Sequence, residues 1–136
     1  MSPPEPLTDY VGERTIVLYE PKEMINAVLE NFSHLRKTMC ICCDNDGFAV
    51  TINAKPIWEG IIALKNRGAK IRWISDITEE NLHYCREIMS VAEIRHLDGI
   101  KGAFGVHDEK YYYASANVIK EGRTLPGELI TSTVKV

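Results

Sequence analysis

The distribution of apolar and polar residues along the chain predicts short strands that alternate with amphipathic helices. Four runs rich in apolar and β-branched residues have the length and composition of strands: residues 14–19, 37–43, 70–74 and 92–96. Three segments carry apolar residues at helical spacing: residues 21–35, about 55–67 and about 79–91. Residues 48–54 fit neither pattern. The alternation indicates crossover connections, and hence an α/β fold with a mixed, mainly parallel sheet and helices on both faces.

Residues that favour helix ends support this division. Pro21 suits the first turn of the first helix, and Gly68 suits the end of the second. Thr78 is a good N-cap for the third helix, with Asn81 at the third position after it.

The segment after the fourth strand predicts a β-hairpin within the sheet. Two strand-like runs, residues 103–106 and 111–118, are joined by the polar residues 107–110. Residues 119–127 contain glycine and proline and predict a loop. Residues 129–136 are strand-like or the start of a helix.

The second strand of this hairpin resembles part of a known signature. Ala114-Ser115-Ala116-Asn117 is similar to the Gly-Ser-x-Asn stretch of the phospholipase D-like superfamily, with alanine in place of glycine. In that signature a histidine, a lysine two residues later and an aspartate five residues after the lysine precede the stretch.

The first part of the signature is missing from this chain. Counting back puts His107 at the acid position or, with a turn shorter by one residue, Asp108. The nucleophile position then falls on Ile100 or Lys101. The lysine position falls on one of two small residues, Gly102 or Ala103. Because nucleophilic catalysis needs an activated side chain, the resemblance implies a degenerate, catalytically inactive copy with no catalytic residue.

A broader resemblance covers roughly residues 15–136. Segments such as ENLHYC and EIRHLDGIKGAFGV read much like the phospholipase D-like N-terminal domain of archaeal sensor histidine kinases and related regulators. Phospholipase D-like enzymes build their site from two such halves, so the resemblance implies a homodimer. It further implies a ligand-binding, sensory or dimerisation module joined to a downstream kinase or regulatory domain. The alternative is an active phosphodiesterase or nuclease of the same superfamily.

Length and charge limit the choices further. A chain of 136 residues predicts one domain, here residues 14–136 after a proline-rich, flexible leader of residues 1–13. A net charge of −3 gives no bulk attraction to nucleic acid or to anionic membranes, so neither is an expected partner. No run approaches the roughly 18 apolar residues of a membrane span, and the acidic N-terminus does not resemble a signal peptide. We therefore expect a cytoplasmic protein, without a cofactor, because no Gly-rich phosphate loop is present.

The four cysteines are interpreted mainly as reduced thiols in the core. Cys40 and Cys42 face one side of their strand and Cys43 faces the other, while Cys85 lies on a helix. No second pair completes a zinc site, so no metal ligand is predicted. A redox or metal role is the alternative.

Candidate ligand-binding residues follow from position and charge. Asp76 lies just beyond the carboxyl end of a strand, where ligands bind in open α/β sheets. Arg72 lies within that strand and must be paired or face a pocket, whereas Trp73 on the opposite side is expected in the core. The basic segment near residues 95–101 is either an anion contact or a solvated turn. The complete set of candidates is Arg72, Asp76, Arg95, His96, Lys101, His107, Ser115 and Asn117.

Overall fold

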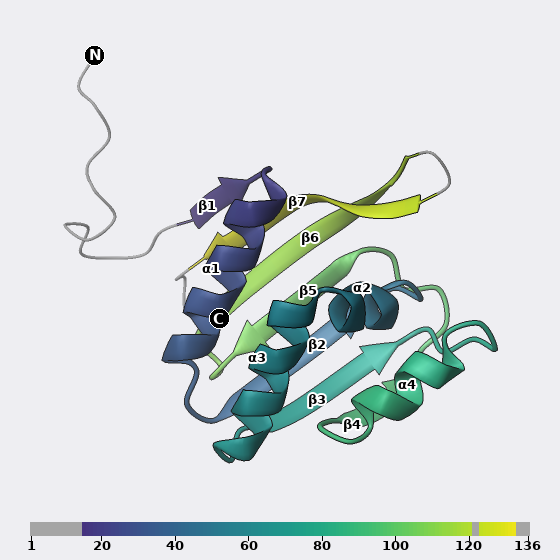
Figure 1. The fold of residues 1–136 in the computed structure, drawn as a ribbon, viewed down its shortest axis with the longest axis horizontal. Coiled ribbons are helices and arrows are strands. Elements are labelled where there is room, and N and C mark those ends of the chain that lie inside the picture. Colours follow the sequence, from purple (N-terminus) through teal and green to yellow (C-terminus); the bar gives the residue numbers. More distant parts are fainter. Residues whose placement is uncertain (1–14, 121–122, 133–136) are drawn as a thin grey trace.

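The computed structural model describes the backbone of residues 15–120 and 123–132 and the side chains of residues 16–114. Four helices are present in this part of the chain: α1 (Pro21–His34), α2 (Gly47–Asn53), α3 (Lys55–Asn66) and α4 (Leu82–Ile88). The strands are β1 (Thr15–Leu18), β2 (Thr38–Cys43), β3 (Lys70–Ser75), β4 (Glu93–His96), β5 (Ala103–His107), β6 (Tyr111–Lys120) and β7 (Arg123–Ser132). Figure 1 shows their arrangement.

The strands form one mixed sheet in the order β1-β7-β6-β5-β2-β3-β4. The predicted mixed α/β fold and its hairpin are confirmed. The parallel part is smaller than predicted, because only the β2–β3 and β3–β4 pairs are parallel. From Ala103 onward the chain returns through tight connections, so β5, β6 and β7 pair antiparallel, and β7 also pairs with β1.

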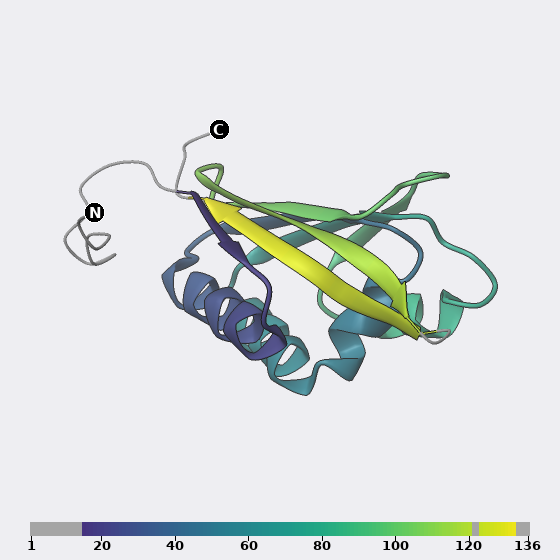
Figure 2. The ribbon, with the colours of Figure 1, turned by 90° about the horizontal axis from the view of Figure 1, so that it is seen from above.

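The four described helices lie on one face of the sheet, not on both as predicted (Figure 2). Strands β2, β3 and β4 follow one another in a single direction across the sheet. Right-handed crossovers between them therefore place their helices on the same side. The burial of β3 alternates accordingly, with Ile71, Trp73 and Ser75 buried while Lys70, Arg72 and Ile74 are exposed. We call the uncovered side the open face.

Two helix predictions needed adjustment. The ambiguous residues 48–54 form most of α2, and α4 is shorter than the predicted helix over residues 79–91. The Thr78 N–H donates to Asn81 Oδ1 at 2.8 Å, and the Asn81 N–H donates to Thr78 Oγ1 at 3.3 Å. This exchange resembles a capping box, but it precedes the helix, which begins at Leu82. Among the described residues, no helix has the length and apolar character needed to cross a bilayer.

The predicted loop over residues 119–127 is largely strand. Strands β6 and β7 pair from Tyr112 and Ser132 to Lys120 and Arg123, with a register shift between Ala116 and Asn117. Pro126 lies just beyond this irregularity, which is where a sheet tolerates a residue without an N–H. The leader predicted for residues 1–13 and the last residues, 133–136, lie outside the described part of the chain.

The core lies between the helices and the covered face of the sheet. Its largest fully buried side chains include Trp73, Phe48, Met39 and Ile61. All four cysteines are free, and Cys43 and Cys85 are buried as predicted. The prediction was wrong for Cys40, which is exposed because no described helix covers the open face.

Candidate functional site

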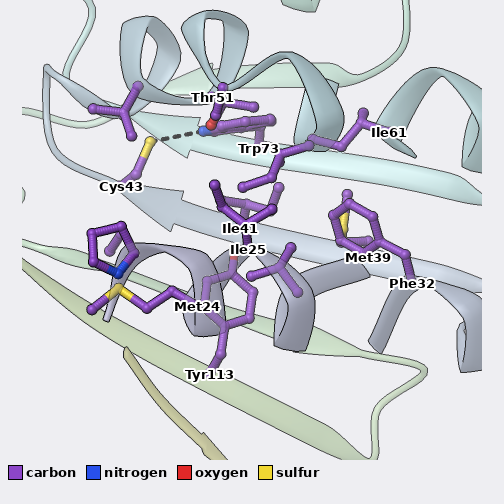
Figure 3. Close-up of a pocket in the computed structure, with 17 residues that line it drawn as sticks. Met24, Ile25, Phe32, Met39, Ile41, Cys43, Thr51, Ile61, Trp73 and Tyr113 are labelled. Carbon is purple, nitrogen blue, oxygen red and sulfur yellow. Dashed lines mark hydrogen bonds between the residues drawn. The ribbon is translucent and has the colours of Figure 1, made fainter. Parts of the chain in front are cut away.

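A pocket of about 190 Å³ lies between helices α1, α2 and α3 and the sheet (Figure 3). Helix α1 contributes Met24 and Phe32, and α2 contributes Thr51. The sheet contributes Trp73 from β3 and Tyr113 from β6. The pocket is therefore built from segments that are far apart in sequence.

The Tyr113 ring can line this pocket because its neighbour across the sheet is a glycine. Gly105 pairs with Tyr113 in the β5–β6 ladder. A Cβ atom at Gly105 would lie 2.4 Å from Cε1 of the Tyr113 ring, far inside normal contact distance. Burial raises the pKa of the Tyr113 phenol, with a further contribution from Cys43. The hydroxyl is therefore neutral at physiological pH.

A short hydrogen-bond chain closes one wall of the pocket. The Trp73 Nε1–H donates to Cys43 Sγ at 2.8 Å, and that thiol donates to Ser75 Oγ at 3.6 Å. The Ser75 hydroxyl donates to the Asp44 carbonyl at 3.0 Å. Burial raises the pKa of Cys43 to about 11, so the sulfur remains a neutral thiol. Gly47 lets α2 approach, since a Cβ atom there would overlap Cys43 Sγ.

His107 is buried in the core next to two pocket residues, Phe32 and Tyr113, but does not line the pocket itself. Its side chain is 3% exposed and is packed between the rings of Phe32 and Tyr113, with centroid distances of 6.0 and 5.4 Å. Its Nε2 atom has no hydrogen-bond partner among the residues that the structure describes. Burial lowers the pKa of His107 to about 4, against a smaller opposite effect of Asp108. The imidazole is therefore neutral near pH 7 and hidden from solvent.

Asp108 ties the hairpin turn to the connection between α1 and β2. Its carboxylate accepts backbone hydrogen bonds from Arg36 at 2.7 Å, Lys37 at 2.6 Å and Thr38 at 3.0 Å. Burial acts to raise its pKa, but these hydrogen bonds outweigh it and lower the pKa. The backbone of Asp108 has a positive φ of 54°. The acidic residue at this point of the signature therefore has a structural role here.

Asp76 and His96, two predicted ligand residues, lie together with Asp98 at the carboxyl ends of β3 and β4, where His96 is the last residue of β4. Ligand atoms of the three lie within 4.8 Å of one another. The Ile77 N–H donates to His96 Nδ1 at 2.9 Å, so Nε2 carries the proton and donates to Asp98 at 2.6 Å. Asp76 accepts the N–H of Gly99 at 3.1 Å. Both ring nitrogens are thus engaged, and the cluster joins two loops.

The other predicted residues are not among the three that form this cluster in the described part of the chain. Arg72 lies on the open face, where its Nε is 3.5 Å from Glu93 Oε2 and both side chains are solvent-exposed. It also borders a hollow of about 200 Å³. Arg95 and Lys101 are exposed. The backbones of Ser115 and Asn117 lie in β6, but their side chains are outside the described residues.

Sequence reasoning missed the pocket because its lining residues carry the ordinary signature of a core. One local signal was present. A glycine inside a strand often marks close approach of another group, and Gly105 lies opposite an aromatic residue. The pairing itself could not be read without the register of the hairpin.

Comparison with known proteins identifies the fold. No protein-family model matches the chain, and no protein of curated function matches it in sequence. NucT from Helicobacter pylori superposes with a TM-score of 0.59 at 13% identity, over 90% of this chain and 86% of NucT. Phosphatidylserine synthase from Haemophilus influenzae Rd KW20 gives 0.59 at 16% identity, over 90% of this chain and 34% of the synthase.

A third structure with this fold is TrmBL2, an archaeal chromatin protein with a novel mode of DNA binding. Its TM-score is 0.59 at 16% identity, over 94% of this chain and 46% of TrmBL2. The chain therefore spans less than half of TrmBL2 and about a third of the synthase. At these identities the similarity shows a phospholipase D-like fold. The predicted likeness to histidine kinase sensor domains remains a prediction.

Proposed function

We propose that this chain is a non-catalytic phospholipase D-like module that pairs with a second copy and binds a ligand within a signalling or transcription-regulatory protein. The downstream partner would be a histidine kinase or another regulatory domain, as the sequence resemblance implies. The observation that carries the proposal is the environment of His107, the imidazole of the signature hairpin.

A phosphodiesterase of this superfamily needs an accessible nucleophile beside a positive charge. His107 is 3% exposed, and its low pKa of about 4 removes the positive charge that would stabilise a phosphoryl transition state. The signature positions upstream hold Ile100 and Gly102, or Lys101 and Ala103. These features favour a binding role over catalysis.

The alternative is a working phosphodiesterase or nuclease, which the fold shared with NucT and phosphatidylserine synthase brings into consideration. We expect no hydrolysis of an aryl phosphodiester, or of single- or double-stranded DNA, above a buffer control. Mass spectrometry of the products should find only intact substrate. Turnover that is lost in His107→Ala, or in the exposed-histidine variant His96→Ala, would instead establish the enzyme.

Pairing would cover the open face of the sheet. Phe104 and Ile74 expose 51% and 40% of their surface there, and Cys40 is exposed beside them. In the β2–β5 register, Cys42 lies opposite Phe104, so these apolar groups occupy adjacent strands. His107 points to the other side of the sheet, because it pairs with the buried Met39 in the same register. A stable interface typically buries about 1,200–2,000 Å² in total.

We expect a dimer by sedimentation at micromolar concentration. Phe104→Glu should yield a folded monomer, because each copy would bury an unpaired carboxylate in the apolar interface. Tyr19→Glu is the matched control, since Tyr19 is 66% exposed and follows β1, the edge strand that lies three places from β5 in the sheet order. A wild-type monomer, or a dimer unaffected by Phe104→Glu, would contradict pairing over this face.

A further inference from the structure

We propose that the pocket beneath α1, α2 and α3 binds a small, uncharged apolar molecule about the size of a substituted aromatic ring. The inference rests on the proposed ligand-binding role and names the chemistry of the ligand. It locates that ligand away from the predicted residues at the strand ends, on the helix-covered side of the sheet.

The walls select against charge. None of the described residues that line the pocket carries a charge. A charged ligand would lose its hydration without gaining an ionic partner, which is strongly unfavourable. The polar atoms of the Trp73–Cys43 pair are already satisfied by each other. Hydroxyl groups in the described lining come only from Thr51 and Tyr113, so a ligand can be offered one or two hydrogen bonds at most.

The small number of polar partners also disfavours water as the occupant. A buried water molecule needs two to four hydrogen-bonding groups, and an apolar cavity of about 150 Å³ in another protein stays dry and binds benzene. The pocket here is of similar size, about 190 Å³. It therefore suits a single ring with small substituents, and it is too small for a nucleotide or a long acyl chain.

The lining is both adaptable and aromatic. Met24 and Met39 have flexible, polarisable side chains that adjust to the shape of a ligand. The rings of Phe32, Trp73 and Tyr113 favour offset or edge-to-face contact with an aromatic ligand. Figure 3 shows these side chains projecting from α1 and from the sheet around the same space.

Access lies between the beginning of α1 and helix α2. Pro21, in the first turn of α1, lines the pocket and is exposed. Ile25 and Thr51 line it and are half-buried, whereas Met39 and Trp73 at the sheet are buried. Exposure therefore falls from Pro21, Ile25 and Thr51 at the mouth of the pocket to the buried residues at the sheet. A ligand can enter at this mouth without unfolding of the core.

The test uses toluene and indole as probes of the wild-type chain, with binding followed by methyl-carbon NMR of isoleucine and methionine. We expect saturable shifts at Met24 and Ile25 and a rise in the melting temperature with probe concentration. Benzoate, a charged ring of similar size, should bind at least about tenfold more weakly because its carboxylate finds no partner.

Two substitutions to phenylalanine separate the pocket from the rest of the surface. Ile25→Phe fills part of the pocket and should weaken toluene binding by about tenfold or more. Met89→Phe changes an apolar side chain that is 62% exposed at the end of α4 and does not line the pocket, so it should leave binding as in the wild type. Should Ile25→Phe fail to fold, Val28→Leu adds a single methylene group to the same wall and should weaken toluene by a smaller factor.

Lack of saturable shifts in the folded wild-type chain would overturn the inference, as would equal affinities for toluene and benzoate. Unchanged binding by the pocket-filling variant would do the same. The hydrolysis and sedimentation experiments use no probe. An empty pocket together with a dimer that lacks turnover would thus remove only the apolar-ligand inference, whereas turnover would remove the non-catalytic function itself.

Discussion

Replacing His107 by phenylalanine is expected to abolish most of the chain's loss of stability between pH 6.5 and 4. The folded-state pKa of His107 is about 4, below its ordinary value of 6.5, because burial disfavours the imidazolium. The unfolded chain therefore binds a proton more readily in this range. The stabilisation is fully present above pH 6.5 and is lost as the pH falls through 4. A gap of this size corresponds to about 3 kcal/mol of unfolding free energy.

Urea unfolding at a series of pH values measures the effect. At neutral pH, His107→Phe should be as stable as the wild type or about 1 kcal/mol more stable, because it removes a buried nitrogen without a partner. His83→Phe is the control, since His83 is exposed on α4. If the control flattened the pH dependence and His107→Phe did not, the assignment to His107 would be wrong.

Gly105→Ala is expected to lower the free energy of unfolding by about 1–3 kcal/mol, the usual range for overpacking a core. The new Cβ atom would lie 2.4 Å from the Tyr113 ring, which must move away from the sheet. Because Tyr113 lines the pocket, the variant should also lose toluene binding. Urea unfolding and the NMR titration measure the two consequences separately.

A double-mutant cycle identifies the clash as the cause. Tyr113→Ala removes the ring. In that background Gly105→Ala should change the free energy of unfolding by no more than about 0.5 kcal/mol, the range within which independent substitutions add. The double variant would then lose less stability than the sum of the losses in the two single variants. Additive losses would mean that Gly105 is needed for its backbone and not for the space it leaves.

The sequence by itself determined the local elements and the state of the catalytic signature. Helical and strand periodicities, with Pro21 and Gly68 at helix ends, were enough to predict three helices and the hairpin within a few residues. The loss of the signature histidine and lysine is also a property of the sequence, since Ile100 and Gly102 need no structure to be recognised. These features depend on neighbouring residues, so short-range patterns contain them.

Tertiary structure alone decided on which face of the sheet the helices lie and where the pocket is. Alternation along β3 is compatible with one or two covered faces, and only the strand order places all described helices on one side. The side on which His107 lies follows from the β2–β5 register, which pairs it with Met39. Asp108 finds its partners at residues 36–38, some seventy positions earlier. Such contacts depend on how the strands are ordered, which no local pattern of residues specifies.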